Sequence, residues 1–186
     1  MRRWRVALAG LAAMVGVGVA TPVTVAATAA AADPACATGW GSTTKQAGTG
    51  TGAHLTGVRA GSQPCFDRLV LDVDGPTSGY WVSYVPQITQ DGSGAVIPTR
   101  GGAALQVVAR APAYDDAGRP TYQPANRTEL VNVAGWPTFR QVVWAGSFEG
   151  DSSVGIGVRA RLPFRVFTLD GPGTGSRIVV DIAHSW

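Results

Sequence analysis

The feature of this sequence that most limits its possible folds is a six-residue pattern that occurs twice, far apart in the chain. Residues 68–73 read Arg-Leu-Val-Leu-Asp-Val, and residues 177–182 read Arg-Ile-Val-Val-Asp-Ile. Because a β-strand points successive side chains to opposite faces, each copy places three apolar side chains on one face and its Arg and Asp on the other. The repeat predicts a β domain whose two halves use strands of the same design, with the chain ending inside the core.

The rest of the chain also favours an all-β fold. Its 25 glycines and 12 prolines separate short apolar segments, and no stretch shows a sustained helical period. Many short strands at close spacing are typical of a sandwich or a barrel. The expected strands are residues 55–60, 68–73, 80–85, 95–98, 105–110, 129–133, 139–145, 154–162, 164–169 and 177–182.

The segment 154–162 has the clearest alternation outside the repeat. Its apolar residues occupy every second position, with Gly155, Gly157, Arg159 and Arg161 between them. Such alternation is typical of a strand with one face against the core and the other in water. We therefore expect both arginines on an outward strand face.

The first part of the chain resembles an export signal. Residues 1–5 are positively charged, residues 6–20 are apolar, and residues 26–32 offer several small-residue cleavage sites. The apolar run is shorter than the ~20 residues that a spanning helix needs. We expect a cleaved secretory signal over residues 1–32 and no transmembrane segment after its removal, so the protein is expected to be exported.

Removing this signal changes the charge of the protein. The whole chain has 15 Lys and Arg against 12 Asp and Glu, and Arg2, Arg3 and Arg5 leave with the signal. The remaining domain is formally neutral. A neutral surface lacks the basic footprint of proteins that bind nucleic acid, so no nucleic-acid partner is expected.

Two cysteines, Cys36 and Cys65, remain after the signal. In an exported protein, one disulfide is the default expectation, and closing a loop of about thirty residues contributes ~3 kcal/mol in the loop-entropy model. It would pin the Gly/Thr-rich N-terminal arm, residues 33–53, to the first repeated strand. Acylation of Cys36 is the alternative, but residues 33–35 lack the Leu and small-residue box that acylation requires. No cluster of metal ligands accompanies the cysteines.

No catalytic motif is present in the sequence. The two histidines, His54 and His184, stand outside any known nucleophile, zinc or phosphate motif. Asp72 and Asp74 share a strand face about 7 Å apart, which would suit an inverting glycosidase. Arg68 lies on the same face, however, and ion pairing across the sheet explains these acids without catalysis. We expect a protein without enzymatic activity or cofactor.

Aromatic side chains favour a binding role instead. Alternation puts Tyr80 and Tyr84 on one strand face and Trp81 on the other, and Trp136 stands at the entry to a strand. Exposed indoles stack on sugar rings, so we take Trp81 and Trp136 as candidate glycan contacts. Trp144 lies in an apolar run and is expected in the core. Arg159 and Arg161 are the candidate contacts for the carboxylates of wall peptides.

The chain resembles the actinobacterial AMIN-like domain over roughly residues 55–183. The resemblance rests on the order and spacing of five segments, residues 66–72, 148–150, 154–157, 163–166 and 177–182. It implies a small two-sheet β-sandwich, export, association with the cell wall, and the absence of catalytic residues.

Together these observations predict an AMIN-like β-sandwich over residues 54–186. Its expected function is that of an exported, non-catalytic module that binds cell-wall peptidoglycan or glycan. The alternative is an interaction scaffold that docks another envelope protein through a sheet edge or through the long loop at residues 111–128.

Overall fold

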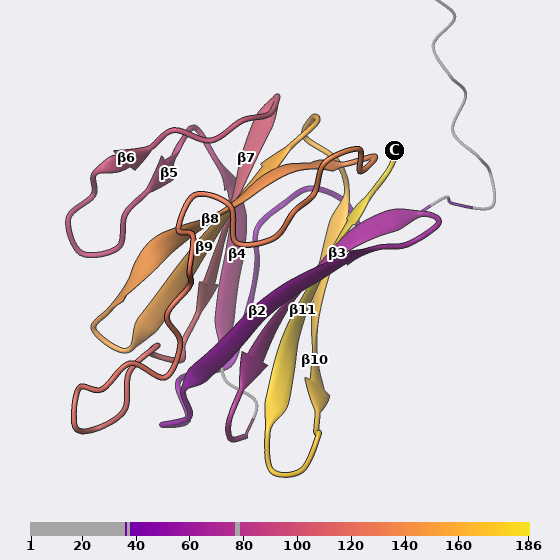
Figure 1. Ribbon diagram of the computed structural model, residues 1–186. Coiled ribbons are helices and arrows are strands. Elements are labelled where there is room, and N and C mark those ends of the chain that lie inside the picture. The colour runs from indigo at the N-terminus through magenta and orange to yellow at the C-terminus, as the bar shows by residue number, and fades with distance from the viewer. Residues whose placement is uncertain (1–35, 37, 77–78) are drawn as a thin grey trace, which may run out of the picture. The chain divides into compact units, whose positions relative to one another are not determined.

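The computed structural model of the protein describes residues 36, 38–76 and 79–186 (Figure 1). The expected signal segment, residues 1–32, lies outside the described residues. In the part of the chain that is described, no helix is long and apolar enough to cross a membrane.

Two antiparallel sheets pack face to face, as Figure 1 shows, which confirms the expected all-β sandwich. One sheet has the order β1-β4-β7-β9-β8, and the other has the order β10-β11-β3-β2. The strands of the five-stranded sheet are β1 (Lys45–Ala47), β4 (Tyr80–Val85), β7 (Ala103–Ala109), β8 (Phe139–Phe148) and β9 (Asp151–Val158). Those of the four-stranded sheet are β2 (Leu55–Ser62), β3 (Phe66–Val73), β10 (Phe164–Asp170) and β11 (Ser176–Ala183). A short hairpin consists of β5 (Ile88–Thr89) and β6 (Val96–Ile97).

The two copies of the repeated pattern form β3 and β11, which are neighbours in the four-stranded sheet. They run antiparallel, so that Arg68 lies opposite Asp181 and Asp72 lies opposite Arg177. Their alternate apolar residues are all buried between the sheets, at Leu69, Leu71, Val73, Ile178, Val180 and Ile182. The repeat therefore supplies the central pair of one sheet rather than matching strands in two halves.

The charged residues of the repeat lie on the outer face of this sheet. Asp181 is fully buried there because Arg68 and Arg165 reach it from the strands on either side. Arg68 donates to both carboxylate oxygens at 2.6 and 2.9 Å, and Arg165 donates through Nε at 2.9 Å. Asp72 pairs with Arg59 of β2 at 2.8 Å. Ion pairs across the sheet are therefore present, but Asp72 pairs with Arg59 rather than with Arg68, which pairs with Asp181.

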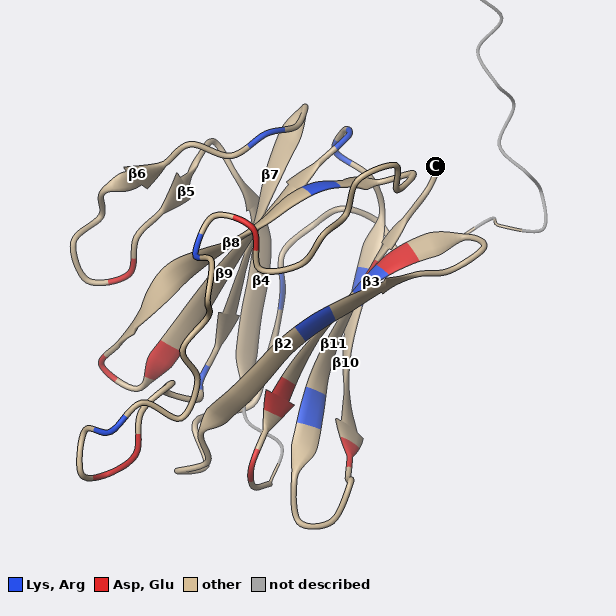
Figure 2. Ribbon diagram, viewed as in Figure 1, with Lys and Arg blue, Asp and Glu red and all other residues tan. Residues whose placement is uncertain are grey.

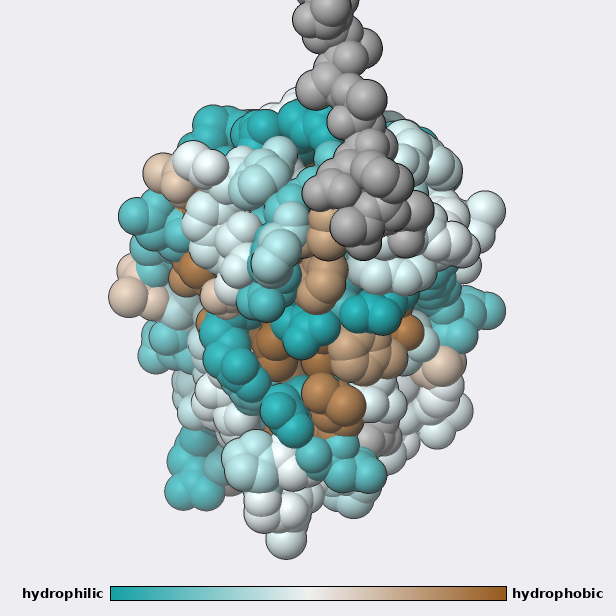
Figure 3. All heavy atoms as spheres, turned by 90° about the vertical axis from the view of Figure 1, so that its right-hand side faces the viewer, coloured by the Kyte–Doolittle hydropathy of each residue, from teal (hydrophilic) through white to brown (hydrophobic). Residues whose placement is uncertain are grey.

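Aromatic rings pack around these arginines. The Arg165 guanidinium lies 4.4 Å from the centre of the Trp40 ring, and Arg68 lies 5.1 Å from the ring of Phe66. Figure 3 views the molecule from this side and shows apolar side chains along the middle of the face, with hydrophilic side chains around them. We call this surface the arginine–aromatic face, defined by Trp40, Phe66, Arg68, Arg165 and Asp181.

Strand β9 departs from its sequence-based prediction. It ends at Val158, and its glycine-bearing face is buried rather than in water. The β5–β6 hairpin and the segment after it fold over this face. A Cβ on Gly155 would lie 2.7 Å from the side chain of Ile88, and one on Gly157 would collide with the backbone oxygen of Arg100. Glycine alternates here because another part of the backbone approaches closely, so the expectation of a water-facing side was wrong.

Two further differences concern the strands at the sheet edges. Residues 129–133, predicted as a strand, form none. They run beside β8, where Leu130 N donates to Val142 O, without building a regular ladder. Conversely, β1 was not predicted: it lies inside the N-terminal arm and pairs with β4, where Gln46 lies opposite Trp81. The described part of the arm is therefore a component of the sandwich.

Candidate functional site

One end of the sandwich gathers arginine and tryptophan side chains. It lies where β8 begins and where β9 and β11 end. Figure 2 shows Lys and Arg at strand ends near the C-terminus, whereas most acidic positions lie toward the opposite end, at the β3, β10 and β8–β9 turns. We call this region the basic end, defined by Trp136, Arg140, Arg159, Arg161 and Trp186.

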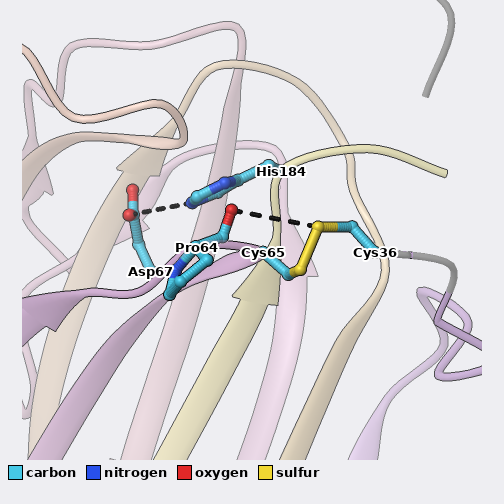
Figure 4. Close-up of a disulfide and its surroundings, with 5 residues drawn as sticks. All are labelled: Cys36, Pro64, Cys65, Asp67 and His184. Atoms are coloured by element: carbon cyan, nitrogen blue, oxygen red, sulfur yellow. Dashed lines mark hydrogen bonds and ion pairs between the residues drawn. A yellow bond between two sulfur atoms is a disulfide. The ribbon is translucent and has the colours of Figure 1, made fainter. Parts of the chain in front are cut away.

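A buried carboxylate holds the basic end together. Asp67 of β3 is fully buried. Its Oδ2 accepts from the backbone N–H groups of Thr138 and Phe139 at 2.9 and 2.8 Å, and its Oδ1 accepts from Ser62 Oγ at 2.7 Å. The Nε2 atom of His184 lies 3.1 Å from the same Oδ1 atom (Figure 4). Asp67 thereby fixes the start of β8 and the end of β11 against β3.

The disulfide lies beside this network. Cys36 is bonded to Cys65, as predicted (Figure 4). The backbone N–H of His184 donates to Cys65 O at 2.9 Å. The bond ties the N-terminal arm to the residue that precedes β3. Because Cys36 is already joined to Cys65, the structure supports the disulfide over acylation of this residue.

The arginines of the basic end bind neutral oxygen atoms. Arg140 Nη1 donates to the carbonyl oxygens of Trp136 at 2.8 Å and Phe139 at 3.0 Å. Arg159 Nη2 donates to His184 O at 2.5 Å. These carbonyl oxygens carry no formal charge, so the bonds orient each guanidinium without neutralising it.

Arg161 is held in the same way. Its Nε and Nη2 atoms donate to Ser42 Oγ and Ser42 O at 3.1 and 2.8 Å. Among the described residues, Arg140, Arg159 and Arg161 have no carboxylate within ion-pair distance. Three guanidinium groups at one end of a formally neutral domain therefore have no ion-pair partner among the described residues.

A hollow lies next to Arg161. The guanidinium lies 4.9 Å from the centre of the Tyr84 ring, and both residues line a cavity of about 480 Å³ with Val85, Pro86 and residues 102–104. Tyr84 accepts from the N–H of Leu162 and donates to its carbonyl, both at 2.9 Å. Burial raises the pKa of Tyr84, which keeps its hydroxyl neutral at physiological pH. The cavity thus has a cation on one side and an uncharged ring beside it.

Two indoles lie at the basic end with the arginines. Trp136 is half-buried and packs on Phe139, with ring centres 5.9 Å apart. Trp186 is 65% exposed, and its indole N–H donates to Arg161 O at 3.0 Å. Each indole is thus anchored on one side, and each keeps surface open to solvent for contact with a ligand.

The structure brings together three of the four residues that the sequence proposed for ligand binding. Trp136, Arg159 and Arg161 lie at the basic end, although both arginines occupy the turn after β9 rather than an outward strand face. Trp81 lies elsewhere, on the outer face of β4 beside Val108. Its predicted orientation, opposite to Tyr80 and Tyr84, is confirmed because those two rings pack against the core.

Sequence reasoning missed three residues of this region. Arg140 lay inside an expected strand, and nothing in its neighbourhood marked it as unpaired. Trp186 gave no pattern to interpret. Asp67 directly precedes the first repeated pattern, and an acid next to a buried strand was the only signal that could have drawn attention to it.

The AMIN-like domain family matches residues 53–184, which include every strand from β2 to β11. The chain belongs to this family. No curated protein and no solved structure matches it. All residues of the basic end except Trp186 fall within the matched AMIN-like range, as do Asp67 and His184. Membership of the AMIN-like family is consistent with a module of the cell envelope.

In the described ranges, no group of three or more His, Cys, Asp or Glu side chains is placed to hold a metal ion. The basic end presents guanidinium groups and aromatic rings to a ligand.

Proposed function

We propose that this AMIN-like domain is an exported, non-catalytic module that binds cell-wall peptidoglycan or glycan through its basic end. The observation that carries the proposal is that Arg140, Arg159 and Arg161 have no carboxylate partner within the described ranges and lie at the same end as two partly exposed indoles. Guanidinium groups form strong forked hydrogen bonds to carboxylates, which peptidoglycan carries on its peptides. Indole rings stack on the faces of the sugars.

The charge distribution supports the same orientation. The domain is formally neutral once residues 1–32 are excluded, so long-range attraction to an anionic wall depends on how its charges are arranged. With the basic end toward the wall, the acidic turns at the opposite end point away from it (Figure 2). Complementary placement of this kind contributes to orientation and association rate more than to affinity.

Sedimentation with purified peptidoglycan tests the proposal. We expect the mature domain to pellet with the wall material. The triple variant Arg140→Gln, Arg159→Gln, Arg161→Gln should remain in the supernatant, because it removes the uncompensated charge. Trp136→Ala should weaken pelleting. Trp81→Ala is the matched control, since this indole lies on another face, and it should pellet like the wild type.

Three outcomes would overturn the proposal or its site. Wild-type protein left wholly in the supernatant would favour the alternative function, docking of another envelope protein, and crosslinking would then identify the partner. Equal pelleting of the wild type and the triple variant would exclude the basic end as the binding site. Loss of binding in Trp81→Ala alone would move the site to the outer face of β4. Circular dichroism of each variant ensures that folded proteins are compared.

A further inference from the structure

A second candidate site lies along the other half of β8, under the long loop between β7 and β8. Two cavities of about 270 and 190 Å³ share Arg127 and Trp144 as lining residues. Tyr122 and Gln123 line the larger cavity, and Ile97 lines the smaller one. We call the two cavities together the Arg127 groove. It lies beside the end of β8, whereas the basic end lies beside its start.

The loop over the groove is held by its own hydrogen bonds. The carboxylate of Asp115 accepts from the N–H groups of Ala117 and Arg119 and from Arg119 Nε at 2.8 Å. These bonds, led by the Arg119 side chain, hold the pKa of Asp115 below its usual range. Thr121 Oγ1 donates to Leu55 O at 2.8 Å, which ties the loop to β2. The groove wall is therefore preformed.

Three of the polar side chains that line the groove lack hydrogen-bond partners among the described residues. Tyr122 meets Trp144 edge to face, with ring centres 5.3 Å apart. In the described part of the chain, no hydrogen-bond partner is present for the Tyr122 hydroxyl, the Gln123 amide or the indole N–H of Trp144, although Trp144 is only 7% exposed. Burial raises the pKa of Tyr122, so its hydroxyl remains a neutral donor. Groups of this kind are available to a ligand.

Arg127 is the unusual residue of this set. Every other arginine that the structure describes uses its guanidinium in a hydrogen bond or an ion pair, and Arg127 does not. Its backbone is fixed, because Arg127 O accepts from the N–H of Trp144 at 2.7 Å. A free cation therefore stands where the two cavities share a wall.

We propose that the Arg127 groove binds a carboxylate carried on a single ring, of the size of one uronic acid. The carboxylate would pair with Arg127, the ring would lie against Tyr122, and its polar substituents would bond to Gln123. The larger cavity, which Arg127, Tyr122 and Gln123 all line, is smaller than the 300–1,000 Å³ typical of sites for drug-sized ligands, so it suits one ring rather than a chain. A sugar acid and the terminal carboxylate of an aromatic amino acid share this chemistry.

An NMR titration separates these sources and tests the site. The indole N–H signal of Trp144 reports on the groove, with glucuronate, its methyl ester, and N-acetylphenylalanine as probes. We expect glucuronate to shift this signal and the ester, which lacks the charge, to bind at least about tenfold more weakly. A shift by N-acetylphenylalanine alone would support the carboxylate site and assign it to peptide ligands.

Variants decide whether Arg127 is responsible. Arg127→Gln should weaken binding of the acid probe at least about tenfold, a difference of about 1.4 kcal/mol. Its fold should be unchanged, because the guanidinium makes no bond within the described domain. Arg59→Gln is the matched control, since Arg59 is paired with Asp72 on the other sheet, and it should bind the probe like the wild type. No shift with either acid probe, or equal affinity in Arg127→Gln, would overturn the proposal.

Discussion

The arginines of the arginine–aromatic face and those of the basic end are the same residue type in opposite situations. On the face, Arg68 and Arg165 share one buried carboxylate, Asp181. At the basic end, Arg140 and Arg159 donate only to backbone carbonyl oxygens. The comparison shows that the partner of a guanidinium group, rather than its exposure, indicates whether an arginine stabilises the fold or is available to bind a ligand.

The physical difference lies in the charge that each cluster leaves over. A buried carboxylate is strongly destabilising unless cations and hydrogen bonds compensate it, so Asp181 requires its arginines for folding. A guanidinium at the solvent-exposed end of the sandwich is hydrated and needs no ion-pair partner for folding. Its hydrogen bond to a backbone carbonyl oxygen orients the group but contributes little to stability. The first cluster is therefore committed to the fold, and the second keeps its charge for a ligand.

The largest effect is expected when the compensation of Asp181 is removed. The double variant Arg68→Met, Arg165→Met keeps the packing of the long side chains and leaves Asp181 buried without a cation. We expect the free energy of unfolding to fall by about 4 kcal/mol. The matched variant Arg140→Met, Arg159→Met loses only hydrogen bonds to carbonyl oxygens, so its free energy of unfolding should fall by about 1 kcal/mol. Urea denaturation measures both, and equal losses would contradict the comparison.

Removing the disulfide tests how much the covalent link contributes to the basic end, apart from the hydrogen bonds of Asp67. The Cys36 and Cys65 positions are 29 residues apart, so the double variant Cys36→Ala, Cys65→Ala should lower the free energy of unfolding by about 3 kcal/mol. Asp67 continues to fix the start of β8 in this variant, and we expect the folded protein to bind wall material normally. Normal folding with loss of binding would show that the arm itself belongs to the site.

Salt distinguishes the two arginine clusters by their function. When the salt concentration rises from about 0.05 to 0.5 M, the screening length falls to a few ångströms. Wall binding through arginines without ion-pair partners should therefore weaken severalfold. Arg159→Gln should bind more weakly at low salt and show a flatter salt dependence. Arg59→Gln is the control, since Arg59 is already paired with Asp72. Co-sedimentation across the salt series measures this, and a wild-type affinity independent of salt would exclude the basic end as an electrostatic site.

The fold was predictable where the sequence repeats or alternates against a single core. Six apolar positions of β3 and β11 were assigned correctly because a strand's period alone decides which side is buried. The same rule failed at Gly155 and Gly157. Glycine at alternate positions is compatible with exposure and with close backbone approach, and only the position of Ile88 decides between them.

The sequence indicated which types of residue could bind a wall ligand, but not which of these residues lie together in the fold. Trp136, Arg159 and Arg161 could be proposed because indoles and guanidiniums suit wall ligands. Which of them meet depends on Asp67, whose bonds reach Phe139 and His184, 72 and 117 residues further along the chain. Such distant pairings follow from sheet order and register, which local patterns do not encode.

The smallest expected effect concerns a carboxylate that is less well compensated than Asp67 or Asp181. Burial, and then the negative charge of Asp151, raise the pKa of Asp91. Because the folded state holds this proton more tightly than the unfolded state does, stability falls as the pH rises from the ordinary value of 3.8 through the raised one. The full destabilisation is present at neutral pH, and Asp91→Asn removes it.

Asp91→Asn should therefore be slightly more stable than the wild type at pH 7, and the gain should disappear below the ordinary Asp pKa of 3.8. Asp67→Asn is the matched change at a carboxylate with four hydrogen-bond contacts, and it should destabilise the protein at pH 7, because neutralisation weakens the bonds from Thr138 and Phe139. Urea midpoints at the two pH values measure both variants. If Asp91→Asn were less stable than the wild type at pH 7, the carboxylate would hold a stabilising contact, and the contrast between compensated and uncompensated acids would fail there.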